Sequence, residues 1–224
     1  MLLEICAYNV RSCRAAEAAG AGRIELCADP GAGGVTPSWG LIQFALEQIS
    51  IPVFPMIRPR GGNFIYDADE LAIMKKDILK CRELGCKGIA TGVQLADNRI
   101  DTDTLSRLVE WAGPMEVTCH KVFDRAPNAL DALHDVMKAG CKRILTSGLA
   151  PTAPEGAAVI KMLAAAAGPD LRIMAGGGVR SANIAALVVA AGAHEYHTSA
   201  IVANDGQYYS DENEIRTIVG YLNA

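Results

Sequence analysis

Two cysteines occur in the same short pattern, in which a glutamate precedes each cysteine by two positions at the end of an apolar run. Glu4 precedes Cys6, and Glu25 precedes Cys27. Thiolates are the ligands that Cu(I) prefers, so two of them held side by side could bind this ion. Zinc would require further donors, such as histidines. The same two cysteines could also be small buried core residues without chemistry.

Carboxyl and imidazole groups lie at similar positions and could act in general acid–base catalysis. Glu4, Glu25 and His120 are the candidate catalytic residues if the protein is an enzyme. His120 and His197 are also the histidines that could complete a zinc site. His194 is a poor partner for His197, because residues three apart on a strand face opposite sides.

A third group of residues is suited to holding an anion. Arg58 and Arg60 flank a proline and precede two glycines, which let the backbone approach a ligand closely. Alternatively, this segment is an exposed loop with an arginine paired to Glu25. Later in the chain, backbone and hydroxyl groups could bind phosphate, and the candidates are Gly176, Gly177, Gly178 and Ser199.

The elements that must position these residues repeat along the chain as a short apolar run followed by an amphipathic segment. The predicted strands are Leu2–Cys6, Arg23–Cys27, Val53–Ile57, Gly88–Thr91, Glu116–His120, Arg143–Thr146, Arg172–Ala175 and His194–His197. Clear helical patterns cover Asp67–Leu84, Pro127–Ala139 and Asp211–Leu222. Such alternation predicts a parallel sheet. The 224 residues leave about 28 per unit, so we predict a single (β/α)8 TIM barrel domain over residues 1–224.

In such a barrel, the site lies at the carboxyl ends of the strands. Strand alternation predicts that one set of polar side chains points into this mouth: Glu4, Cys6, Glu25, Cys27, Arg58, His120 and His197. Inward charges must pair with one another or serve a ligand. A structural ionic layer, with Glu4 and Glu25 paired to Arg58, is the alternative to a functional site. Lys121 follows His120 and is expected to point outward, so no Schiff-base lysine is predicted.

Composition excludes several classes of protein. Half of the residues are hydrophobic, and the net charge is −4, which argues against a general nucleic-acid binder. No run reaches the length of about 18 apolar residues that a membrane span needs, and no targeting signal is visible. The seven cysteines include no C-x-x-C pair, which is typical of free thiols in a reducing compartment. We therefore expect a cytoplasmic protein.

Several of these segments resemble the CutC family of copper homeostasis proteins. The motifs that carry the resemblance cover nearly the whole chain and include Glu4-Ile5-Cys6, Arg23-Ile24-Glu25-Leu26-Cys27, Met56-Ile57-Arg58-Pro59-Arg60-Gly61-Gly62 and Thr118-Cys119-His120-Lys121-Val122-Phe123-Asp124. The resemblance implies a (β/α)8 barrel that is cytoplasmic and binds copper, with Cys6 and Cys27 at the positions proposed to hold Cu(I). Two positions depart from the family pattern, where Lys121 replaces an arginine and Asn63 replaces an aspartate.

Three functions stay open at this point. The first is a copper-binding protein in which Cys6 and Cys27 hold Cu(I), with Met56 or His197 as an additional donor. The second is a barrel enzyme that acts on a small anionic substrate resembling a sugar phosphate. The third is a scaffold whose polar mouth is vestigial. A copper ion and a small anionic ligand are the expected partners, nucleic acid and membranes are not, and homo-oligomerisation is left open.

Overall fold

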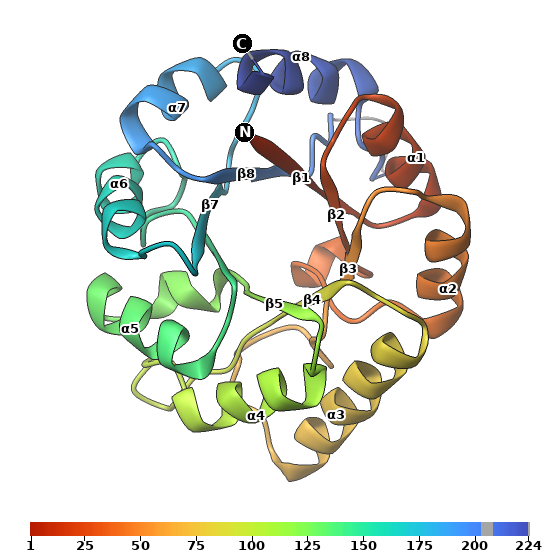
Figure 1. Cartoon of the computed structure of the whole chain (residues 1–224), viewed down its shortest axis with the longest axis vertical. Helices are drawn as coiled ribbons and strands as arrows, with labels where there is room; N and C mark the ends of the chain where they lie inside the picture. Colours follow the sequence, from red (N-terminus) through yellow and green to blue (C-terminus); the bar gives the residue numbers. More distant parts are fainter. Residues whose placement is uncertain (203–207, 224) are drawn as a thin grey trace.

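A computed structural model describes residues 1–202 and 208–223. Eight parallel strands form a nearly closed barrel inside a ring of eight α-helices (Figure 1), which confirms the predicted single (β/α)8 TIM barrel. The strands are β1 (Leu2–Ala7), β2 (Arg23–Leu26), β3 (Val53–Pro55), β4 (Gly88–Thr91), β5 (Glu116–Cys119), β6 (Arg143–Thr146), β7 (Arg172–Gly176) and β8 (Glu195–Thr198). None of the described helices is long and apolar enough to cross a membrane.

The helices follow the strands in strict alternation, as the sequence pattern predicted. They are α1 (Val10–Ala18), α2 (Trp39–Gln48), α3 (Ala68–Glu83), α4 (Thr102–Ala112), α5 (Ala129–Ala139), α6 (Ala157–Ala166), α7 (Ile184–Ala191) and α8 (Glu212–Asn223). Two short 3₁₀-helices, η1 (Pro30–Ala32) and η2 (Lys121–Arg125), occupy loops that follow β2 and β5. The loops after β2 and β5 are therefore partly ordered by local hydrogen bonds.

The sheet runs in the order β3-β2-β1-β8-β7-β6-β5-β4. Between β3 and β4, the ring is closed by a bridge between Met56 and Ala90, where the Ile57 N–H donates to the Ala90 carbonyl at 2.7 Å. Thr91 adds a hydroxyl hydrogen bond to the Ile57 carbonyl at 3.0 Å. This contact has one bridged pair, whereas the ladders elsewhere in the ring have two to four, and we call it the β3–β4 seam.

The register of the central strands brings site residues from distant parts of the sequence together. In β1 and β2, Cys6 lies opposite Glu25, and in β1 and β8, Glu4 lies opposite His197. Aliphatic side chains at the alternate positions, such as Ile5 in β1, are fully buried in the layer between strands and helices. Alternation therefore assigns the polar side chains to the barrel interior, as in other strands whose two faces differ.

A buried ionic layer fills the interior below the mouth. Arg23 forms salt bridges with both Glu4 and Glu195. Arg143 joins the same layer through Glu195 at 2.6 Å and Glu116 at 3.0 Å. The predicted alternative, in which Glu4 and Glu25 pair with Arg58, is wrong, because Arg23 lies on the neighbouring strand at the same depth as Glu4.

Helix α3 begins with a capping box that also fixes the preceding loop. The Asp67 carboxylate accepts the Glu70 N–H at 2.8 Å, and the Glu70 carboxylate accepts the Asp67 N–H at 3.0 Å. We expect Asp67→Ala to lower the free energy of unfolding by about 1 kcal/mol, because the cap satisfies backbone donors that the helix cannot. Urea denaturation would measure this. The matched control is Asp69→Ala, an exposed first-turn residue outside the box, for which a loss as large as that of Asp67→Ala would contradict the capping role.

Candidate metal and ligand site at the barrel mouth

A cavity of about 250 Å³ opens at the carboxyl ends of the strands. Its walls come from strand ends and from the loops that follow them, as expected for the functional end of a TIM barrel. The lining residues are Cys6, Tyr8, Glu25, Gly33, Met56, Arg58, Phe64, His120, Lys121, Leu145, Gly177, Gly178, Arg180, His197, Thr198 and Ser199. One wall holds the sulfur-containing side chains of Cys6 and Met56 beside the carboxyl group of Glu25, and basic side chains enter from the loops.

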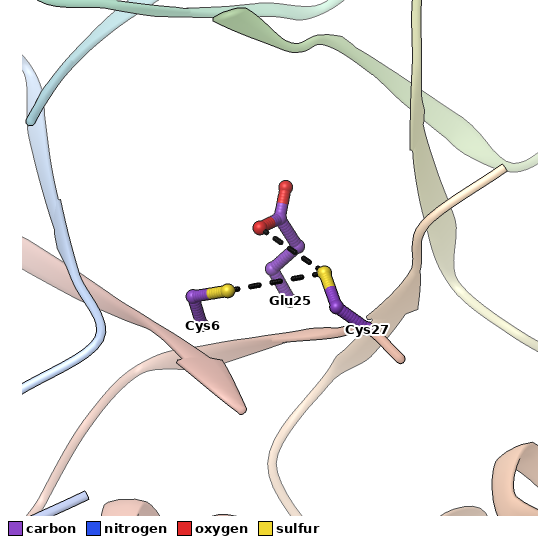
Figure 2. Close-up of side chains that lie close together, drawn as sticks. All are labelled: Cys6, Glu25 and Cys27. Atoms are coloured by element: carbon purple, nitrogen blue, oxygen red, sulfur yellow. Dashed lines mark hydrogen bonds between the residues drawn. The ribbon is translucent and has the colours of Figure 1, made fainter. Parts of the chain in front are cut away.

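A cluster of three potential metal ligands lies at this wall, where Cys6 and Glu25 line the cavity and the fully buried Cys27 does not. Figure 2 shows the side chains of Cys6, Glu25 and Cys27 converging inside the barrel. The two Sγ atoms are 3.8 Å apart, and Cys27 Sγ lies 3.6 Å from Glu25 Oε2. One potential ligand atom from each of the three residues lies within 4.8 Å of the others. We call these three residues the Cys-Glu-Cys cluster.

Residues from two places pack closely on this cluster: Met56, which follows β3, and Gly34, in the loop after β2. Met56 packs with both cysteines in one small buried group. Gly34 adopts a left-handed backbone (φ +90°), and a Cβ atom there would lie 3.2 Å from Cys27 Sγ. A glycine is therefore required both by the backbone conformation and by the close approach to the thiol.

The two thiols differ in acidity because they share one hydrogen bond. That hydrogen bond lowers the pKa of Cys6 well below its ordinary value, and the nearby His197 also favours the Cys6 thiolate. The same contact raises the pKa of Cys27, and burial raises it further. Burial and the Cys6 charge likewise raise the pKa of Glu25. Of the two thiols, Cys6 is therefore the one whose thiolate is favoured, and burial opposes ionisation of Cys27 and Glu25 beside it.

Glu4 links the ionic layer to the cluster through His197. The His197 Nδ1 atom lies 2.7 Å from Glu4 Oε1, and its Nε2 atom lies 3.9 Å from Glu25 Oε2. Burial alone would raise the pKa of Glu4, but the Arg23 guanidinium and His197 hold it at about 2. Burial would lower the pKa of His197, but hydrogen bonds to Cys6 and Glu4 raise it well above its ordinary value. The carboxylate thus orients the imidazole so that Nε2 faces the cluster.

His120 is neutral, and one of its ring nitrogens makes no hydrogen bond to the loop that the residue caps. It follows β5 and caps η2, where its Nδ1 atom accepts the Val122 N–H at 3.2 Å. Burial and the nearby Arg58 lower the pKa of His120 to about 3. Because Nδ1 accepts, the ring proton is on Nε2. This buried atom has no hydrogen-bond partner among the described residues.

The side chains of the two arginines in the loop after β3 lie in different places and have different partners. Arg58 lines the cavity and donates to the carbonyl oxygens of Ala32, Gly34 and Gly62 at 2.8–3.0 Å. Arg60 instead forms a salt bridge with Glu70 at the start of α3 and does not line the cavity. Neither arginine pairs with Glu25, so the predicted alternative for this loop is also wrong.

The loops after β7 and β8 contribute the remaining predicted residues. Gly177, Gly178 and Ser199 line the cavity, whereas Gly176 does not. Gly176 ends β7, and a Cβ atom there would lie 2.4 Å from Leu145 Cδ1, so close packing explains this glycine.

The expected outward orientation of Lys121 is wrong. Lys121 belongs to η2 rather than to β5, so strand alternation does not govern it, and it lines the cavity. The prediction extended the strand one residue too far, because His120 caps η2. Arg180 also lines the cavity and was missed, although its position immediately after the glycine run and Val179 was a visible signal.

Comparison with known proteins decides the family. The sequence profile of the CutC family matches residues 1–202. The chain belongs to the CutC family. A CutC family protein of Chromobacterium violaceum is 47% identical over 199 residues, which cover 89% of this chain and 81% of that protein. A CutC family protein of Klebsiella pneumoniae is 45% identical, with 89% and 80% coverage.

Solved structures agree with this assignment to the CutC family. A crystal structure from Streptococcus agalactiae, described as a proposed copper homeostasis protein CutC, has a TM-score of 0.84 and 33% identity, covering 89% of this chain and 98% of that one. Phosphoribosylanthranilate isomerase from Pyrococcus furiosus has a TM-score of 0.65 at 12% identity, covering 100% and 98%, which shows the barrel fold alone. The resemblance noted in the sequence is therefore confirmed, and the family is one named for copper homeostasis.

Proposed function

We propose that the protein binds Cu(I) as its cargo through the thiolates of Cys6 and Cys27. The observation that carries this proposal is the buried pair of sulfurs, 3.8 Å apart, at the functional end of the barrel. Metal–sulfur bonds in proteins are about 2.3 Å long for zinc, so a single ion of similar size can reach both sulfurs when these are less than about 4.6 Å apart. The pair meets this requirement without movement of the backbone.

The chemistry of the surrounding donors favours copper over harder ions. Thiolate and thioether sulfur select Cu(I), and Met56 packs directly against the two cysteines. His197 could add its Nε2 atom, because Nδ1 is held by the Glu4 carboxylate in the arrangement that commonly orients histidine ligands. Glu25 completes the cluster, and its Oε1 atom has no hydrogen-bond partner among the described residues.

The proposal includes a cytoplasmic location, where thiols stay reduced and Cu(I) is the relevant oxidation state. All seven cysteines are free, which is consistent with such a compartment. Binding of copper to both sulfurs would release the remaining thiol proton, since metal ligation requires the thiolate. In this function the protein holds and passes on the ion, and no reaction of a substrate is required.

Anaerobic titration with Cu(I) against a competing chelator tests the proposal. We expect Cys6→Ser and Cys27→Ser each to weaken Cu(I) binding by more than about 100-fold, because even outer-shell changes at metal sites cost about 10–100-fold. The matched control is Cys141→Ser, which alters a buried cysteine in the link before β6, outside the mouth. Equal Cu(I) affinity in the wild type and in Cys6→Ser would rule out the thiolate site.

A further inference from the structure

The cavity offers more space and more positive charge than a copper site needs. Its volume of about 250 Å³ is several times the roughly 30 Å³ that one water molecule occupies in the liquid. Among the described residues, its lining includes three basic side chains, Arg58, Lys121 and Arg180, and one carboxyl group, Glu25. The cavity is therefore electropositive, although the chain as a whole carries a net charge of −4.

Three buried polar atoms, in residues that line this cavity, have no hydrogen-bond partner among the described residues. They are Glu25 Oε1, Arg58 Nε and His120 Nε2, in residues that are 3%, 5% and 3% exposed. Buried polar atoms in proteins are almost always hydrogen-bonded. All three residues line the same cavity. The described part of the fold therefore leaves polar groups unpaired in the wall of this cavity.

The side chain of Lys121 lies against the loop that follows β7. A Cβ atom on Gly177 would lie 3.0 Å from Lys121 Nζ, which places the ammonium group beside this backbone. The nearest carboxylate is Asp124, whose Oδ2 atom is 3.6 Å from Nζ. That carboxylate already accepts hydrogen bonds from Ser147 and Leu149, so the lysine retains donors for another acceptor.

Arg180 belongs to this same loop after β7. Its guanidinium group donates to Thr198 Oγ1 at 2.9 Å and to the Ile201 carbonyl at 3.3 Å. No carboxylate in the described part of the chain lies within salt-bridge distance of it. Within residues 1–202 and 208–223, the N–H groups of Gly177 and Gly178 also have no backbone acceptor. Two cations and adjacent backbone donors thus surround one end of the cavity.

We propose that this cavity binds a small organic phosphate, with the phosphate group between Lys121, Arg180 and the Gly177–Gly178 backbone. A phosphate monoester suits this end because its three terminal oxygens can accept hydrogen bonds from several directions, and donors come from the loops that follow β5 and β7. The rest of the molecule lies beside His120, which also lines the cavity. The inference does not rest on the copper proposal, since none of the phosphate donors belongs to the Cys-Glu-Cys cluster.

Calorimetric titration of the metal-free protein tests this site, with inorganic phosphate and glycerol 3-phosphate as the probes at low ionic strength. We expect Lys121→Met to weaken binding of both probes by about tenfold or more, because hydrogen bonds to charged groups contribute about 1.5–3 kcal/mol. Lys121 makes no other close contact that the fold requires, and its side chain is 42% exposed, so this variant should fold. Lys142→Met, an exposed lysine before β6, is the matched control and should bind like the wild type.

Two further variants distinguish phosphate binding from copper binding and from a purely structural effect. Arg180→Lys keeps the charge but loses the forked donor, and should weaken binding several-fold while leaving the fold intact by thermal unfolding. Cys6→Ser should keep phosphate binding, so loss of copper binding and loss of phosphate binding can be told apart. The proposal is overturned if the wild type binds neither probe, or if Lys121→Met and Lys142→Met bind them equally.

Discussion

Replacing Arg23 by methionine is expected to lower the free energy of unfolding by about 3–5 kcal/mol, a large part of the stability of a domain of this size. Arg23 is 4% exposed and forms salt bridges with Glu4 and Glu195. Methionine fills a similar volume but leaves two buried carboxylates without their shared partner. Removing one member of a buried ion network costs far more than the network itself contributes, because the remaining charges stay desolvated.

Chemical denaturation at neutral pH measures this loss. The matched control is Arg172→Met, which replaces an exposed arginine at the start of β7, in register with Arg143. We expect this control to lie within about 0.5 kcal/mol of the wild type. A loss of less than 1 kcal/mol for Arg23→Met would show that the ionic layer is not needed for the fold.

Replacing Asp124 by alanine is expected to lower the free energy of unfolding by about 3 kcal/mol, because one carboxylate satisfies several donors of the loop after β6. It accepts the Thr146 hydroxyl at 2.5 Å, the Ser147 N–H at 3.0 Å and the Leu149 N–H at 3.1 Å. Leu149 has a left-handed backbone (φ +59°), which is costly for a residue with a side chain. The carboxylate therefore holds the loop in a conformation that the sequence alone disfavours.

The same denaturation assay can separate the charge from the shape of this side chain. Asp124→Asn retains one acceptor oxygen and should fall between the wild type and the alanine variant. Asp131→Ala, an exposed carboxylate in the first turn of α5, is the control and should change stability by less than about 1 kcal/mol. Equal losses for Asp124→Ala and Asp131→Ala would show that the loop does not depend on this carboxylate.

Much of the mouth could be predicted because strand alternation is a local property. Cys6 and Glu25 are separated by a helix, yet each is placed inward by its own strand, and the parallel register then makes them neighbours. Pairing between charges is not local. Arg23 shares its inward face with Glu25 and so could have been placed, but which carboxylate it meets depends on the stagger of β1, β2 and β8.

Residues beyond the strand ends were the least predictable. Arg60 was expected at the mouth, but it pairs with Glu70 because the α3 capping box places that carboxylate beside the loop. Lys121 was expected to face outward, but the 3₁₀-helix η2 redirects it. In both cases a local hydrogen-bonded turn, rather than strand periodicity, determines the direction of the side chain.

The β3–β4 seam links the proposed copper site to the closure of the barrel. Met56 lies at once in the bridge that closes the ring and in the buried group formed with the two cysteines. A segment joined by so few backbone hydrogen bonds opens locally at a lower free energy than the continuous ladders. An ion that binds only while the ring is closed would stabilise the closed ring by mass action. Binding of the ion and local opening of the barrel at the seam would then be thermodynamically linked, so that occupancy of the site lowers the fraction of open barrel.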